Sequence, residues 1–468
     1  MLFTRSFQNS IRKYLLLIAL IIVGSNSSAQ QYSKSAILFD LEYLRSSLEK
    51  THFNLFAYTT KSDFQENYLE VKRQIQSDSL SLLQVTSLFQ NVVTKANNGH
   101  TRIAFPAQPY LNYAQSGGRI FPLEVAIQNG KVFIRKNWSE NSELKIGDEL
   151  ISINGVPINE ILGKIYPQIS AERLYFKNAQ LEAFTLPRYY WQVFGEQNEF
   201  EVQIAGKEGQ TNHKLTAIKA MEDFEMKRDD ILNPDWDFKY LSESAAYLRP
   251  GGFGGNEEKY RSFIDSVFVA INGRKQKNLV IDLRNNPGGD DAFSDYLVSY
   301  IADRPFKWSS KFELKSSAIL KDDVRQSKDT TNMYWKSILQ HDDGEIYDYD
   351  FGFQQPQPLE KRYKGEVYVL VNRQSYSQST VTAAQIQDYG FGQIVGEETA
   401  EFPNLYASIF SYQLPKTGIR VDVSKGRIQR VSRTDNNQGV IPDIIIQDHL
   451  LDEKDEILEE IQRKIKLQ

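Results

Sequence analysis

From residue 245 onward the sequence alternates short apolar runs with amphipathic stretches, and this rhythm constrains the fold more than any other feature. The strand-like runs are 245–248, 279–283, 367–371 and 393–395, and the helical stretches are 260–271, 293–301 and 378–389. Strands that alternate with helices predict an α/β core whose sheet is at least partly parallel.

Two further regions precede this core. Over residues 32–89, apolar residues at three- and four-residue spacing predict amphipathic helices. Over residues 117–204, short alternating segments predict a small β-domain. Within it, residues 144–157 (LKIGDELISINGVP) resemble the most recognisable segment of PDZ domains. The resemblance implies a domain that captures an extended peptide by strand addition. The alternative is a small β-domain that only supports its neighbour.

Residues 1–29 have the pattern of a secretory signal peptide. Basic residues come first, residues 14–23 form an uninterrupted apolar run, and small residues lead to Ala29. The run is too short to span a bilayer comfortably, so we expect cleavage after Ala29, with an uncleaved anchor as the alternative. The mature protein is then expected to be secreted or periplasmic, without a stable membrane span.

The chain as a whole is predicted to be a multidomain α/β protein. We expect the signal peptide at 1–29, a helical region at 30–115, the PDZ-like domain at 116–212 and the core at 213–468. Residues 306–362 interrupt the core with mixed charges and aromatic residues. Because this stretch is long for a structureless loop, a partly ordered insertion is predicted.

Composition excludes several classes of function. The 55 Lys and Arg residues nearly balance the 60 Asp and Glu residues, so no nucleic acid partner is expected. The absence of cysteine excludes thiol nucleophiles, disulfides and Cys-ligated zinc. No histidine pair stands at metal-binding spacing, and no cofactor or metal is predicted. An imidazole base must be one of the 5 histidines, which are His52, His100, His213, His341 and His449.

Ser377 stands where a buried strand gives way to a helix. The apolar run 367–371 leads into a short polar turn, and the helix is predicted to begin directly after Ser377. At the positive end of that helix, the Gln378 amide is suited to receive an oxyanion while Ser377 attacks. The structural alternative is an ordinary serine N-cap.

A second strand ends in two consecutive glycines. After the apolar run 279–283 the chain continues to Gly288 and Gly289. Glycines at the carboxyl end of a strand let backbone N–H groups point into a crevice, where they can supply the other half of an oxyanion hole. A plain turn between strand and helix is the alternative.

Together these segments resemble peptidase family S41, which comprises the C-terminal processing (tail-specific) and the tricorn-like proteases. The resemblance covers essentially everything after the signal peptide. It depends on residues 98–101, 144–157, 281–289, 377–390, 394–399 and 439–443, which follow in the family's order. It implies a core of the ClpP/crotonase-like type, Ser377 as the nucleophile, and a peptide or unfolded protein as substrate.

One departure from the family pattern affects the mechanism. Processing proteases use a Ser-Lys pair, and here Phe402 stands at the position of the lysine. Because phenylalanine cannot accept a proton, the base must differ. Resemblance to the tricorn-like branch implies a Ser-His arrangement backed by a carboxylate. His100 is therefore the predicted base. Glu398 is favoured as the carboxylate, with Glu397 and Asp435 left open.

The resulting hypothesis is a secreted or periplasmic serine endopeptidase. Ser377 attacks the peptide carbonyl, His100 takes its proton, and the amides of Gln378 and of Gly288 or Gly289 hold the oxyanion. The alternative is a non-catalytic S41-like protein that binds peptide or lipid, which the phenylalanine at the lysine position favours.

Overall fold

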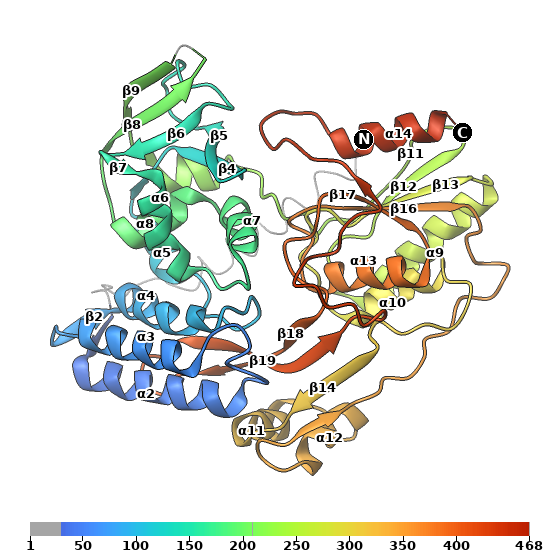
Figure 1. Cartoon of the computed structure of the whole chain (residues 1–468), viewed down its shortest axis with the longest axis horizontal. Helices are drawn as coiled ribbons and strands as arrows, with labels where there is room; N and C mark the ends of the chain where they lie inside the picture. Colours follow the sequence, from blue (N-terminus) through green and yellow to red (C-terminus); the bar gives the residue numbers. More distant parts are fainter. Residues whose placement is uncertain (1–29, 208, 468) are drawn as a thin grey trace.

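The computed structural model describes residues 30–207 and 209–467. The chain forms two lobes, and the long strands β18 (Leu405–Gln413) and β19 (Arg420–Gln429) reach from one lobe to the other (Figure 1). The signal peptide predicted at residues 1–29 lies outside the described residues. Among the described residues, no helix combines the length and the apolar character needed to cross a membrane.

One lobe is built on a six-stranded sheet with the order β11-β12-β13-β16-β17-β20. The strands are β11 (Asp237–Tyr240), β12 (Ala245–Arg249), β13 (Asn278–Asp282), β16 (Glu366–Val371), β17 (Gln393–Gly396) and β20 (Ile444–Ile445). From β12 to β20 the neighbours run parallel, whereas β11 is antiparallel to β12. The runs predicted as strands coincide with β12, β13, β16 and β17, which confirms the predicted α/β core.

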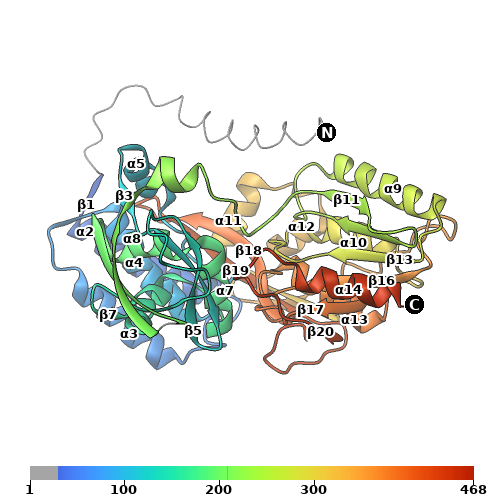
Figure 2. The ribbon, with the colours of Figure 1, turned by 90° about the horizontal axis from the view of Figure 1, so that it is seen from above.

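Helices cover both faces of this sheet (Figures 1 and 2). They are α9 (Glu257–Gly273), α10 (Asp291–Ser299) and α13 (Gln378–Tyr389) on one face and α14 (Glu456–Lys466) on the other. In β16, Val369 faces the first group while Tyr368 and Leu370 face α14. The strand sequences are continuously apolar because both faces of the sheet are buried.

The PDZ-like domain forms the upper part of the other lobe in Figure 1. Its sheet has the order β4-β5-β6-β8-β9, with β7 paired to β6. The elements are β4 (Leu123–Gln128), β5 (Lys131–Asn137), β6 (Glu149–Ile153), β7 (Val156–Pro157), α6 (Ile158–Ile165), α7 (Leu174–Phe184), α8 (Leu186–Phe194), β8 (Glu199–Gly206) and β9 (Gly209–Thr216). The PDZ-like sequence segment forms β6, a tight turn, β7 and the start of α6. Strand β4 lies at an edge of the sheet.

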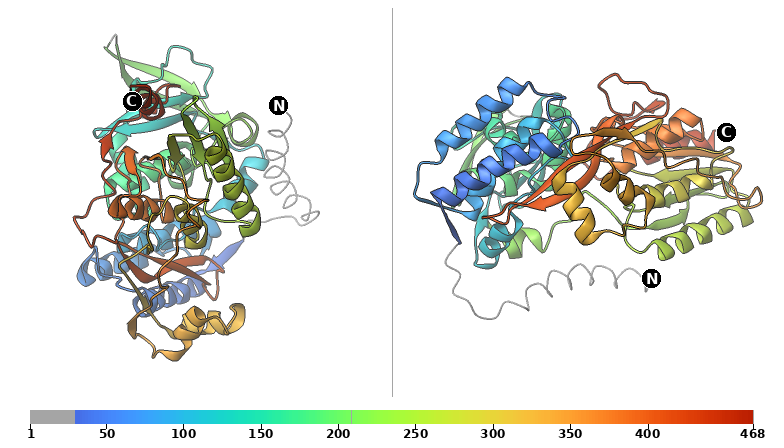
Figure 3. Two further views of the ribbon diagram at one scale, coloured as in Figure 1. Left: turned by 90° about the vertical axis from the view of Figure 1, so that its right-hand side faces the viewer. Right: turned by 90° about the horizontal axis from the view of Figure 1, so that it is seen from below.

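The N-terminal helices share a hydrophobic core with the β18–β19 ribbon and with the region 306–362 (Figure 3). These elements are α2 (Lys34–Thr51), α3 (Lys61–Gln74), α4 (Leu82–Val93), β14 (Lys311–Lys315), α11 (Ala318–Ser327), α12 (Met333–Gln340) and β15 (Ile346–Asp348). Strands β15, β14, β19 and β18 form one sheet in that order. Helices from residues 34–93 therefore pack against strands from residues 405–429, far apart in the sequence.

Short elements complete the fold. They are β1 (Gln31–Ser33), β2 (Ser79–Ser81), η1 (Thr94–Ala96), α5 (Ala107–Gln115), β3 (Arg119–Ile120), η2 (Tyr166–Gln168), β10 (Ile218–Lys219) and the π-helix η3 (Ala220–Glu225). Among them, η1 leads directly into the turn that carries His100.

Candidate active site

Ser377 lies between the end of β16 and the first turn of α13. Its backbone has φ +55° and ψ −123°, a conformation that costs free energy in a residue other than glycine. Its side chain makes no capping hydrogen bond to the helix, so the N-cap alternative does not describe this serine. The neighbouring Ser375 holds the turn instead, because its hydroxyl donates to the Leu283 carbonyl at 2.8 Å. Ser377 itself is half-buried.

His100 lies against Ser377 although the two are far apart in sequence. The distance from His100 Nε2 to Ser377 Oγ is 3.0 Å. The imidazole is 2% exposed and stacks on the Tyr376 ring, with 5.0 Å between ring centroids and 10° between the ring planes. The Tyr376 hydroxyl in turn donates to the Gly99 carbonyl at 3.3 Å. These contacts hold the imidazole within reach of the serine hydroxyl.

The carboxylate behind His100 belongs to Glu401. Glu401 Oε1 lies 2.9 Å from His100 Nδ1, an ion-pair contact in which the N–H direction is not aligned for a hydrogen bond. Glu401 Oε2 accepts the backbone N–H of Ser377 at 2.5 Å. Glu401 is 1% exposed. One buried carboxylate thus contacts both the histidine and the backbone of the serine.

Glu398 was expected here from the sequence, and the structure corrects that expectation, because Glu401 contacts His100 instead. Glu398 Oε1 lies 2.7 Å from Arg173 Nη2 and accepts the Gly439 N–H at 2.8 Å. The two alternatives are also engaged elsewhere, Glu397 with Arg373 and Asp435 with Arg427. The signal for Glu401 was its position directly before Phe402, in the loop where the processing proteases have their base.

Phe402 is 7% exposed and lies in a cluster of aromatic and cationic side chains. The Arg173 guanidinium is 5.1 Å from the centre of its ring, and the Tyr58 ring lies beside it at 6.3 Å. The phenylalanine therefore packs next to Glu401 as an apolar side chain in the position that the family gives to lysine.

The two glycines after β13 approach Ser377 closely. Gly288 has φ +81°, and a Cβ atom there would lie 2.7 Å from both Gln378 N and Ser377 Cβ. Gly289 has φ +141°, and a Cβ atom there would lie 1.8 Å from the Phe253 carbonyl oxygen. Both positions require glycine for space as well as for conformation.

The three predicted oxyanion donors differ in their availability. The Gly288 N–H donates to Asn286 Oδ1 at 2.9 Å and is already engaged. Within residues 30–207 and 209–467, the N–H groups of Gly289 and Gln378 have no acceptor. The Gln378 amide also lies at the N-terminus of α13, where the helix dipole favours negative charge.

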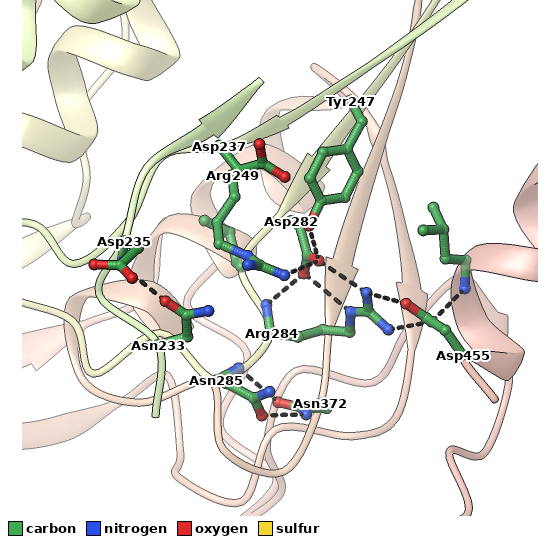
Figure 4. A network of polar contacts seen from close by, with 12 residues as sticks. Asn233, Asp235, Asp237, Tyr247, Arg249, Asp282, Arg284, Asn285, Asn372 and Asp455 are labelled. Atoms are coloured by element: carbon green, nitrogen blue, oxygen red, sulfur yellow. Dashed lines mark hydrogen bonds and ion pairs between the residues drawn. The ribbon is translucent and has the colours of Figure 1, made fainter. Parts of the chain in front are cut away.

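Asparagine side chains join the loop after β13 to the loop after β16 (Figure 4). Asn372 Nδ2 donates to Asn285 Oδ1 at 2.8 Å, and the Asn285 N–H donates to Asn372 Oδ1 at 3.1 Å. The glycine loop and the serine loop are therefore tied to each other directly.

An ion-pair network anchors the end of β13, as Figure 4 also shows. Arg284 Nη2 lies 2.8 Å from Asp282 Oδ2 and 2.9 Å from Asp455 Oδ2. Burial alone would raise the pKa of Asp282, but the Arg284 guanidinium outweighs it and holds that pKa below its ordinary value. The network connects the glycine loop to the start of α14.

Comparisons with known proteins agree with this architecture. Residues 244–446 match the model of peptidase family S41, and residues 118–227 match the model of a PDZ domain. No curated protein matches the chain. In fold, the chain is similar to mature CPAF complexed with lactacystin, with a TM-score of 0.65 at 15% identity over 92% of this chain and 98% of that chain. A second structure of mature CPAF gives a TM-score of 0.61 at 16% identity, over 88% of this chain and 92% of that chain.

The S41 match contains Ser377, Glu401 and both glycines, whereas His100 precedes it. The PDZ match begins at residue 118 and extends past residue 212 to residue 227, just beyond the end of η3. The resemblance stated from the sequence is thereby confirmed. The chain carries a domain of peptidase family S41 at residues 244–446 and a PDZ domain at residues 118–227, and it is a serine-type peptidase.

Proposed function

We propose that Ser377, His100 and Glu401 form the catalytic triad of an endopeptidase. The observation that carries the proposal is the 3.0 Å contact between Ser377 Oγ and His100 Nε2, backed by Glu401 at 2.9 Å from Nδ1. Nucleophile, base and carboxylate in this order constitute the arrangement that activates a serine hydroxyl at neutral pH.

In the proposed reaction, Ser377 Oγ attacks the carbonyl carbon of the scissile peptide bond. His100 Nε2 takes the hydroxyl proton and returns it to the leaving amine, and the acyl-enzyme is then hydrolysed by water through the same proton transfers. Glu401 orients the imidazole and stabilises the imidazolium. The free N–H groups of Gly289 and Gln378 receive the oxyanion, while Gly288 shapes the loop.

Substrate capture is assigned to the PDZ domain. An extended peptide is proposed to add to the edge strand β4. At this edge the Ile127 N–H donates to Glu182 at 2.7 Å, and the Ile127 carbonyl accepts from Arg373 at 3.1 Å. An incoming peptide therefore has to replace these side chains. The signal-like sequence at residues 1–29 supports action in the periplasm or outside the cell.

Reaction with a fluorophosphonate probe tests the triad. We expect the wild-type protein to be labelled, Ser377→Ala to be unlabelled, and His100→Ala to react at least about 100-fold more slowly, since the base is lost. His341→Ala is the matched control, because His341 is a half-buried histidine that pairs with Glu345. Equal labelling of wild type, Ser377→Ala and His100→Ala would contradict the proposal.

A further inference from the structure

Glu172 is a carboxylate of the PDZ domain that contacts the turn carrying His100. It precedes α7 and falls within the PDZ match. Its Oε1 accepts the Asn98 side-chain N–H at 3.0 Å and the Gly99 backbone N–H at 2.9 Å. One carboxylate oxygen therefore fixes the two residues that directly precede His100.

The other oxygen of Glu172 is enclosed without a partner. Although part of the residue reaches the surface, Oε2 is buried and accepts no hydrogen bond from the described residues. A buried carboxylate oxygen without a donor is costly, which makes it an uncommon feature in a structural contact.

The charged and titratable groups around Glu172 are those of the active site. Glu401 and His100 face it, and so do the phenols of Tyr58 and Tyr376. Burial, followed by the nearby Glu401 carboxylate, raises the pKa of Glu172 to about 7. Above that pH Glu172 is charged, and its negative charge stabilises the imidazolium that forms when His100 takes the serine proton.

The first turn of α7 docks against the same turn. Phe176 Cε1 occupies the space where a Cβ atom of Gly99 would lie, at 2.7 Å, and its ring packs on Tyr376 with centroids 5.3 Å apart. Phe176 also joins a small apolar cluster with Ala179 and Ala400. Through this packing the PDZ domain contacts both the turn that carries His100 and the loop that carries Glu401.

We propose that Glu172 is a positioning residue for His100, through which the docked PDZ domain holds the histidine turn and adds a negative charge beside the imidazole. The inference rests on the proposed function, because it assigns a role in the same site.

The pKa of Glu172, followed by carboxyl NMR in the Ser377→Ala protein, tests the inference without requiring activity. Because a negative charge on Glu172 and a positive charge on the imidazole stabilise each other, removal of the imidazole in His100→Ala is expected to raise the pKa of Glu172 by about half a pH unit. His341→Ala is the matched control for this change, since the His341 imidazole pairs with Glu345. In Glu172→Gln the amide oxygen can still accept both hydrogen bonds but the charge is gone, and Glu225→Gln is the control for that variant, since this carboxylate of the same domain pairs with Arg188.

Labelling by the fluorophosphonate provides the second readout. Glu172→Ala removes both the charge and the hydrogen bonds to Asn98 and Gly99, and we expect it to react about 10-fold more slowly than wild type. The rate of Glu172→Gln is expected to lie between those of Glu172→Ala and wild type. An unchanged pKa of Glu172 in the His100→Ala protein, or wild-type labelling of Glu172→Ala, would overturn the inference. A failure of wild-type labelling would instead contradict the proposed function, and the NMR result would stand independently.

Discussion

At the residue scale, Glu401 joins the proposed triad, because its carboxylate contacts both His100 and the backbone of Ser377. Its carboxylate reaches His100 Nδ1 with one oxygen and the Ser377 backbone N–H with the other. Ser377 was predictable because a strand, a polar turn and a helix in succession determine where a serine is presented. The carboxylate was not, because Glu397, Glu398 and Glu401 share one short loop.

Side chains from distant parts of the chain decide which of these glutamates faces the histidine. Arg173 Nη2 pairs with Glu398, and the same guanidinium donates to the carbonyl oxygens of Thr399 and Ala400 at 2.9 Å. Arg173 lies in the PDZ domain, more than 200 residues earlier in the sequence. The sequence around the glutamates does not indicate such a distant contact. Identifying the glutamate that contacts His100 therefore required the structure.

The first prediction separates the two glutamates. Glu401→Gln keeps the shape of the side chain but cannot stabilise the imidazolium, and we expect kcat/KM for peptide hydrolysis to fall about 10³- to 10⁴-fold. Glu398→Gln is the matched variant, for which a loss below about 10-fold is expected, since Glu398 does not contact His100. A larger loss in Glu398→Gln than in Glu401→Gln would contradict the assignment.

At the element scale, two loops at the carboxyl ends of neighbouring parallel strands build the site. The loop after β13 brings the glycines and the loop after β16 brings Ser377. This arrangement follows from the sequence, because adjacent parallel strands end at the same edge of a sheet. The cross-link between Asn285 and Asn372 was not predicted, since side-chain pairing between loops depends on the register of β13 and β16.

The second prediction concerns this cross-link. Asn372→Ala removes the hydrogen bonds that its side chain makes to Asn285 and to the Gln374 N–H. We expect a loss of about 1–3 kcal/mol in the free energy of unfolding, measured by urea denaturation, and slower labelling of Ser377 because the two loops are no longer tied. Asn436→Ala, in an exposed loop, serves as control. Wild-type stability and labelling of Asn372→Ala would contradict this role.

At the scale of the whole molecule, the N-terminal helices and the β18–β19 ribbon form one hydrophobic core. The sequence predicted the helices correctly, but it indicated a helical region that precedes the core rather than one that packs against β18 and β19. Amphipathic spacing identifies the apolar face of a helix and does not identify the partner of that face. The result is that His100, which follows these helices, is brought to Ser377.

The third prediction concerns a buried lysine of this ribbon. Lys425 is 2% exposed and Nζ donates to the carbonyl oxygen of Ser408 at 2.9 Å. Burial lowers the pKa of Lys425 to about 7, well below the value of about 10.4 in an unfolded chain. Between these values the unfolded state binds the extra proton, so this lysine makes the free energy of unfolding increase as pH rises.

Urea denaturation at pH values from about 7.5 to 9.5 measures that increase. We expect the free energy of unfolding of the wild type to rise, relative to Lys425→Met, by up to about 1.4 kcal/mol per pH unit. Lys416→Met is the matched control, because Lys416 is an exposed lysine of the same region. Parallel pH profiles of wild type and Lys425→Met would show that the lysine is charged in the folded protein.

The central claim is that Ser377 is the nucleophile and that His100 activates it. Mass spectrometry of the protein after reaction with a fluorophosphonate tests this most directly, because it locates the covalent bond. The account predicts one phosphonyl group per chain, on Ser377, which forms at least about 100-fold more slowly when His100 is replaced by alanine. A phosphonyl group on another serine, or no adduct on the wild-type protein, would contradict it.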